Sequence, residues 1–294
     1  FELVFPGSPT TNALLATSYI SILPNILLYF VPKEIESSTL SLLFHFAGGN
    51  LLGDLFLHLL PHVFGAQTDD KNRLMGIGLF LGVFLFYATD KCMGSNFQSK
   101  KVSQDITLPQ KRYNLRPRKG DKEVEDENKI VTTRKRKMAV DKMRPSNHFF
   151  ADFIHSLVDG MALTASFYTS PTVGAATTTA VLFYKLPHNI RHFTTLLKAG
   201  STNAQRAQLI TTILAHITAF VGIALHELVR HFERRDHGAT VKWHDAILSV
   251  VAGGYLYFAI ISVSTKSKDR IHSIKELLSM VFGLIFMVFI SWNE

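Results

Sequence analysis

Long apolar stretches alternate with short polar connections along most of the chain. Eight can be marked, at Leu14–Val31, Leu40–Phe64, Leu74–Cys92, Phe149–Phe167, Val173–Leu197, Leu209–Leu228, Ala246–Val263 and Ile274–Trp292. Each is close to the roughly 20 residues that a helix needs to cross a bilayer. The apolar residues are continuous rather than alternating, which argues against barrel strands. The pattern predicts an all-α membrane protein with eight transmembrane helices; a large soluble protein with eight buried helices is the alternative.

One polar connection is much longer than the others. Residues Met93–Asn147 hold 15 Lys and Arg against 7 Asp and Glu, and this excess of +8 equals the formal net charge of the 294-residue chain. The segment has few large apolar residues, so we expect it to be disordered. The predicted organisation is therefore residues 1–92 with three helices, a disordered basic loop at 93–147, and residues 148–294 with five helices.

The charge of this loop predicts the orientation of the chain. Loops rich in Lys and Arg stay in the cytosol, and an even number of crossings then places both termini on the opposite side. Anionic lipid head groups of the surrounding bilayer are the best specific partner for such a loop. Nucleic acid is not expected as a partner, because no folded reading module accompanies the basic residues. The single cysteine, Cys92, excludes a disulfide within the chain.

Polar residues inside the apolar stretches are unevenly distributed. Charged groups in a bilayer are costly, so those that remain are usually functional or paired. Most lie in the second, fourth and fifth stretches, and a last histidine lies in the sixth: Asp54, His58, His62, Asp152, His155, Asp159, Lys185, His188, Arg191, His192 and His216. We therefore expect a polar site enclosed by the second, fourth and fifth helices.

The spacing of these residues indicates the chemistry. His155 and Asp159 are four residues apart and share a helix face, as do His188 and His192, and as do Asp54, His58 and His62. Imidazole and carboxylate groups in this arrangement suit zinc or a similar divalent cation. A single intramembrane histidine is more often a packing residue. Pro61 and Pro187 each precede a histidine and predict kinks that expose backbone carbonyls.

The chain resembles the ZIP family of divalent-metal transporters in several motifs. The segment Gly48–His62 is similar to the family's second helix, and Ala151–Gly160, with the letters ADFIHSLVDG, is similar to its fourth helix. Tyr184–Asn189 occupies the place of the fifth-helix motif His-Glu-x-Pro-His-Glu, and Gly253–Tyr257 resembles the seventh helix. This branch of the family includes yeast zinc transporters of the endoplasmic reticulum.

The resemblance implies a ZIP-like bundle with a metal site in the middle of the membrane. In the family the fourth and fifth helices form a two-metal site, and His155, Asp159 and His188 match its ligands. Four positions depart from the family pattern: Ser156, Tyr184, Lys185 and Asn189. An ammonium repels a divalent cation, and Lys185 near Asp159 would form an ion pair in place of a metal. We therefore expect at most one metal, with Ser156 and Asn189 as weak oxygen donors. The predicted pathway adds Asp54, His58, His62, Lys185 and His216.

Three functions follow from these residues. The resemblance implies transport of Zn²⁺, with Fe²⁺ and Mn²⁺ as alternatives, toward the cytosol by alternating access and without catalysis. The substitutions at Tyr184 and Lys185 favour a relative that has lost transport and regulates active transporters. Ser156 beside His155 leaves an intramembrane zinc hydrolase as a third hypothesis. The resemblance also implies an endoplasmic reticulum or Golgi membrane, and a second copy of the chain is a candidate partner in a homodimer.

Overall fold

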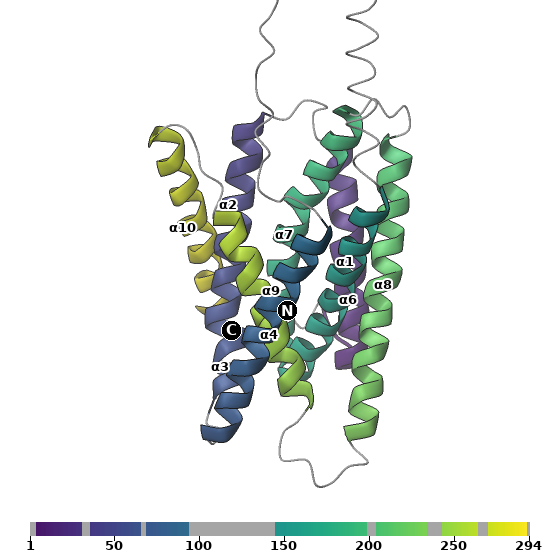
Figure 1. Ribbon diagram of the computed structural model, residues 1–294, viewed down its shortest axis with the longest axis vertical. Coiled ribbons are helices and arrows are strands. Elements are labelled where there is room, and N and C mark those ends of the chain that lie inside the picture. The colour runs from purple at the N-terminus through teal and green to yellow at the C-terminus, as the bar shows by residue number, and fades with distance from the viewer. Residues whose placement is uncertain are drawn as a thin grey trace, which may run out of the picture.

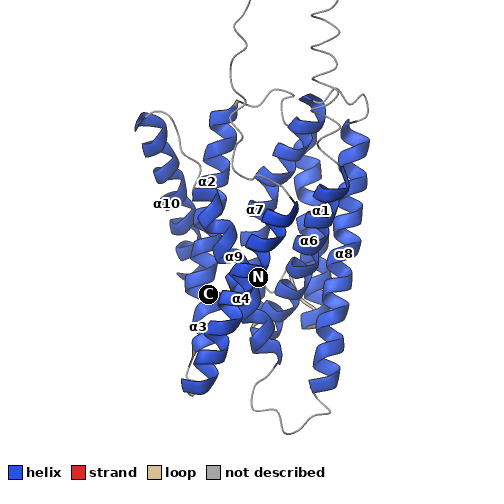
Figure 2. Cartoon of the chain, in the orientation of Figure 1, coloured by secondary structure: helices blue, strands red, loops and turns tan. Residues whose placement is uncertain are grey.

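The computed structural model of the chain describes residues 4–30, 36–65, 69–93, 145–198, 204–233, 243–263 and 270–292. This part is almost entirely helical, and Figure 2 shows no strand in it. The helical elements are α1 (Pro9–Phe30), α2 (Ser37–Asp54), η1 (Leu55–Leu59), α3 (Leu60–Phe64), α4 (Asp69–Met93), α6 (Pro145–Thr169), α7 (Pro171–Lys198), α8 (Ala204–Glu233), α9 (Trp243–Val263) and α10 (Arg270–Trp292). The all-α prediction is confirmed.

Each predicted apolar stretch corresponds to one continuous helical segment, because α2, η1 and α3 follow one another without a break. Consecutive segments run in opposite directions along the bundle (Figure 1). Within the described residues, six segments are long and apolar enough to cross a membrane, namely α1, α2–α3, α4, α8, α9 and α10. The helices α6 and α7 are not among them; both carry charged residues, namely Asp152, Asp159, Lys185 and Arg191, together with other polar side chains that lower their hydropathy.

The position of α7 in the bundle explains how it holds polar residues. This helix contacts α1, α2, α6, α8 and α10, so its neighbours cover most of its surface (Figure 1). In contrast, α4, α8 and α10 each present many exposed leucine, isoleucine and phenylalanine side chains. These outer helices can face lipid, while the inner helices place their polar groups among other helices, where a bilayer tolerates them.

Two helices begin with the same local motif. Ser170 precedes Pro171, and its hydroxyl oxygen accepts a hydrogen bond from the backbone N–H of Val173 at 3.0 Å. Ser8 precedes Pro9, and its hydroxyl accepts from the N–H of Thr11 at 3.3 Å. A serine N-cap followed by proline is a strong start signal, because proline lacks an N–H that the first helical turn would leave unpaired. Pro171 accordingly marks the start of α7.

Glycines allow three pairs of helices to pack with their backbones close together. A Cβ atom at Gly49 of α2 would overlap the Met280 carbonyl of α10, and one at Gly283 of α10 would overlap the Phe46 carbonyl of α2. The pair α4 and α9 has the same reciprocal arrangement at Gly82 and Gly253, and the pair α6 and α8 has it at Gly160 and Gly222. Small residues at such contacts are typical of helix packing in membranes.

The predicted basic loop falls mostly on residues 94–144, which lie outside the described residues. Its two ends are helical rather than part of a loop, since α4 continues to Met93 and α6 begins at Pro145. Proline suits the first turn of a helix, which is why α6 begins before its apolar stretch.

Candidate metal-binding site

All the predicted metal ligands lie around one cavity. His155, Ser156 and Asp159 come from α6, and His188 and Asn189 come from α7. Lys185 of α7, which we placed in the transport pathway, lines the same cavity. The α6 and α7 helices thus place the predicted ligands around one common cavity.

Most of the remaining walls of the cavity come from α1 and α8, of which the sequence indicated only α8, through His216. The α1 and α8 helices line it with Ile20, Ser21, Gln208, Thr211, Thr212 and Ala215, and α6 and α7 add Asp152, Tyr184 and His192. No residue of α2 is among these, so the prediction that the second helix encloses this site is wrong. Hydroxyl and amide groups of α1 and α8 take its place. Such groups are hard to recognise in a sequence, because a hydroxyl on a helix can also bond to a carbonyl of that helix. Thr212, for example, donates to the Gln208 carbonyl, so its presence alone does not indicate that it lines a cavity.

An ion pair occupies the middle of the predicted ligand set. The ammonium of Lys185 lies 2.9 Å from Oδ2 of Asp159, and the two side chains are only 18% and 8% exposed. One turn of α6 and one turn of α7 thus place a fixed positive charge at the carboxylate that we predicted as a metal ligand. A cation that uses this oxygen must displace the ammonium.

His155 is held by aromatic rings. Its imidazole stacks on Phe86 of α4, with centroids 5.4 Å apart and planes at 8°, and meets the edge of Phe258 of α9 at 4.8 Å. The Nε2 atom is buried and has no hydrogen-bond partner in the structure. The ring is therefore fixed in orientation by packing, and one of its nitrogens remains available to a ligand.

His188 lies beside a carboxylate that was not in the predicted ligand set. Its Nε2 atom is 3.9 Å from Oδ1 of Asp152, and both side chains are partly exposed. The ring also stacks on Tyr184, with centroids 6.4 Å apart. Asp152 stands three residues before His155, so it extends the polar face of α6 by one turn. This spacing is the feature of the sequence from which Asp152 could have been predicted as part of the site.

The ligands are gathered but not arranged around a common point. Among the described residues, no group of three or more His, Cys, Asp or Glu side chains is placed to hold a metal ion. The Asp159–Lys185 pair accounts for this in part, because it directs the carboxylate toward the ammonium. Binding a cation therefore requires rearrangement of side chains in the cavity.

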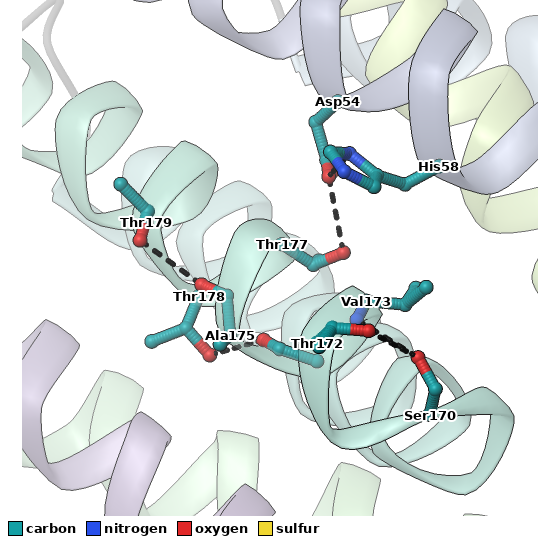
Figure 3. Close-up of polar contacts among 10 residues, drawn as sticks. Asp54, His58, Ser170, Thr172, Val173, Ala175, Thr177, Thr178 and Thr179 are labelled. Carbon is teal, nitrogen blue, oxygen red and sulfur yellow. Dashed lines mark hydrogen bonds and ion pairs between the residues drawn. The ribbon is translucent and has the colours of Figure 1, made fainter. Parts of the chain in front are cut away.

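Two of the other predicted pathway residues form a separate buried pair on α2 and η1. Nδ1 of His58 lies 3.3 Å from Oδ1 of Asp54, and Thr177 of α7 donates a hydrogen bond to the same oxygen at 3.3 Å (Figure 3). Both side chains of the pair are buried, whereas His62 is exposed. Of the three residues predicted to share one face, the structure brings Asp54 and His58 together, while His62 lies in the last turn of the short helix α3.

The last predicted pathway residue, His216 of α8, lies behind the cavity wall. Its Nδ1 atom is 2.8 Å from the hydroxyl of Ser21, and Ser21 itself lines the cavity. His216 borders a second, largely apolar pocket between α1 and α8. It contacts the candidate site through Ser21 and does not line it directly.

Comparison with known proteins places these features in one family. The family model described as ZIP Zinc transporter matches residues 9–291. The zinc transporter YKE4 of Saccharomyces cerevisiae is 30% identical over 266 residues, which cover 88% of this chain and 71% of that protein. The zinc transporter ZIP13 homolog of Drosophila melanogaster is 29% identical, over 86% of this chain and 77% of its own length. The human zinc transporter SLC39A7 is 27% identical, over 96% and 71% respectively.

Proposed function

The chain belongs to the ZIP zinc transporter family, and on this basis we propose that it carries Zn²⁺ across a membrane through the cavity between α1, α6, α7 and α8. The observation that carries the proposal is the convergence of His155, Asp159 and His188 on that cavity. The family consists of transporters and not enzymes, so we reject the hypothesis of an intramembrane zinc hydrolase.

We propose a single metal position in this cavity. Nε2 of His155 and the imidazole of His188 supply nitrogen ligands, and Asp159 supplies a carboxylate, which together suit Zn²⁺. Ser156 and Asn189 complete the coordination as weak oxygen donors. Lys185 takes the place of a second cation, since its ammonium lies at Asp159. Fe²⁺ and Mn²⁺ remain alternative cargo for the same donor set.

The proposed arrangement in the membrane has eight crossings. The central helices α6 and α7 span the bilayer inside the ring of outer helices that contact them. The basic segment 94–144 faces the cytosol by the positive-inside rule, and Zn²⁺ moves toward that side. We assign the chain to an endoplasmic reticulum or Golgi membrane, and a homodimer remains a prediction.

The Asp159–Lys185 pair favours one other function, that of a relative without transport that regulates active transporters. A stable internal ion pair in the site would hold the cavity closed to cations. In that case the native chain transports no zinc, and the double change Lys185→Glu with Tyr184→His creates transport.

Zinc uptake into sealed vesicles distinguishes these functions. We expect vesicles with the native chain to take up radioactive ⁶⁵Zn²⁺ faster than empty vesicles, and His155→Ala to reduce uptake at least tenfold. His272→Ala is the matched control, because His272 is on α10 and does not line the cavity. Uptake equal to that of empty vesicles would remove the transport proposal, and robust uptake by the native chain would remove the regulatory one.

A further inference from the structure

Two histidines meet at the end of the bundle opposite the ends of α4 and α6 that flank residues 94–144 (Figure 1). His226 lies in the last turns of α8, and His244 lies in the first turn of α9. Nε2 of His226 and Nδ1 of His244 are 3.4 Å apart, and the two rings meet edge to face. Neither residue lines the central cavity.

The separation of these nitrogens fits a zinc site. Two nitrogen ligands that are each about 2.05 Å from a zinc ion at the tetrahedral angle lie about 3.4 Å from each other. We propose that His226 and His244 form a second Zn²⁺ site, at which a cation binds before it enters the central cavity. The existence of this site is independent of the proposed function, whereas its place before the central cavity rests on it.

The contacts around His244 allow the required nitrogen to be unprotonated. The hydroxyl of Thr169 donates to the Ala165 carbonyl at 3.1 Å and lies 3.4 Å from Nε2 of His244. In the tautomer that places the ring proton on Nε2, Thr169 accepts from that nitrogen and Nδ1 presents a lone pair toward His226. A bond of this kind to the outer nitrogen is typical of zinc-bound histidines.

Packing fixes the second histidine. The His226 side chain is fully buried and stacks on Tyr168 of α6, with centroids 5.7 Å apart and planes at 20°. Arg230 lies over the same tyrosine ring at 3.3 Å. Glu227 accepts a hydrogen bond from Thr10 of α1 at 2.8 Å. The site is thus held by α6, α8 and α9 together.

The chemistry of the pair predicts weak, exchangeable binding. The described residues offer no third His, Cys, Asp or Glu ligand, so water must complete the coordination. Metal at Nε2 of His226 also requires its proton to move to Nδ1, which is buried and has no hydrogen-bond partner among the described residues. Coordination positions filled only by water and the cost of moving the His226 proton both weaken binding. The site therefore releases its zinc ion readily, as the first binding site of a transport pathway must.

Equilibrium dialysis of the purified full chain with ⁶⁵Zn²⁺ tests the proposal. We expect two bound equivalents in the native chain, and one in His226→Gln and in His244→Gln. His231→Gln is the matched control, since His231 is exposed near the end of the same α8 helix, and it should bind two. If His244→Gln binds zinc at both sites with affinities within twofold of the native values, the proposal is overturned. The 3.4 Å contact between His226 and His244 would then be an ordinary hydrogen bond between imidazoles.

A rescue variant separates metal binding from stability. His244 is partly exposed, and His244→Cys replaces one zinc ligand by another, so we expect it to regain the second equivalent that His244→Gln loses. Failure of this rescue in a folded protein would also count against the site. His155→Ala should lose the other equivalent; if it keeps both while His244→Gln loses one, the proposed central site fails and this inference stands.

Discussion

Among single side chains, Lys185 has the largest effect on what the cavity can bind. Its ammonium lies 2.9 Å from Oδ2 of Asp159. This cation neutralises the carboxylate in an ion pair that does not include His155 or His188. In the proposed single-metal site, an incoming Zn²⁺ must therefore compete with the Lys185 ammonium for Asp159.

Replacing this lysine should strengthen metal binding. Lys185→Gln removes the charge that competes for Asp159, and we expect zinc affinity at the central site to rise about tenfold, or about 1.4 kcal/mol. The unpaired carboxylate should also lower the thermal stability of the metal-free protein. Equilibrium dialysis and thermal unfolding with and without Zn²⁺ measure both effects.

The control for this change is Lys91→Gln at the exposed end of α4. It should leave both the affinity and the unfolding temperature unchanged. Unchanged affinity in Lys185→Gln would mean that Asp159 does not bind the metal.

Thr177 offers a test of the buried pair on α2. Thr177→Val removes the hydrogen bond to Asp54 at nearly constant volume, and we expect a loss of about 1 kcal/mol in unfolding free energy. Thr179→Val is the control on the same helix, because Thr179 donates only to the Ala175 carbonyl of its own helix (Figure 3). Equal stability of the two variants, measured by denaturant or thermal unfolding, would show that the contact with Asp54 contributes nothing.

Individual side chains also show where sequence reasoning succeeds and fails. The i, i+4 rule and the cost of charge in a bilayer place His155, Asp159 and His188 on inner helix faces, and the structure brings these faces together. The same rule does not predict that His62, in the last turn of α3, is exposed and not buried with Asp54 and His58. It also misses Ser21 and Gln208, since uncharged polar residues on apolar helices have no pattern that marks them as lining a cavity.

Among the helices, the glycine contacts determine how closely partners approach. The added methyl of Gly49→Ala would meet the Met280 carbonyl of α10, so the two backbones must separate, and we expect a loss of about 1–3 kcal/mol in stability. Gly76→Ala is the control, because a Cβ there has no neighbour within 4 Å, and it should be neutral. Thermal unfolding of the detergent-solubilised variants checks this prediction, and a neutral Gly49→Ala would mean that α2 and α10 separate without cost.

For the chain as a whole, the charge of residues 94–144 predicts its orientation. An epitope inserted in this segment should be accessible from the cytosol in selectively permeabilised cells, and tags at either terminus should be accessible only after the endomembrane is opened. Within the described residues, six helical segments meet the length and hydropathy needed to span a bilayer. Because omitting the crossings of both α6 and α7 would leave each terminus on the same side, an epitope between these two helices near Ser170 is the test of whether they cross, and with eight crossings it should be accessible only after the endomembrane is opened. A terminus on the same side as the epitope in residues 94–144 would contradict eight crossings.

The charges around the cavity imply how a carrier of this kind responds to voltage. Its lining has three formally charged side chains, Asp152, Asp159 and Lys185, so with neutral histidines the metal-free cavity is mononegative. One Zn²⁺ makes it monopositive, with the same magnitude of charge. A membrane potential that favours passage of the monopositive loaded site therefore also favours the return of the mononegative empty site, because each half of the cycle moves charge in the same electrical direction.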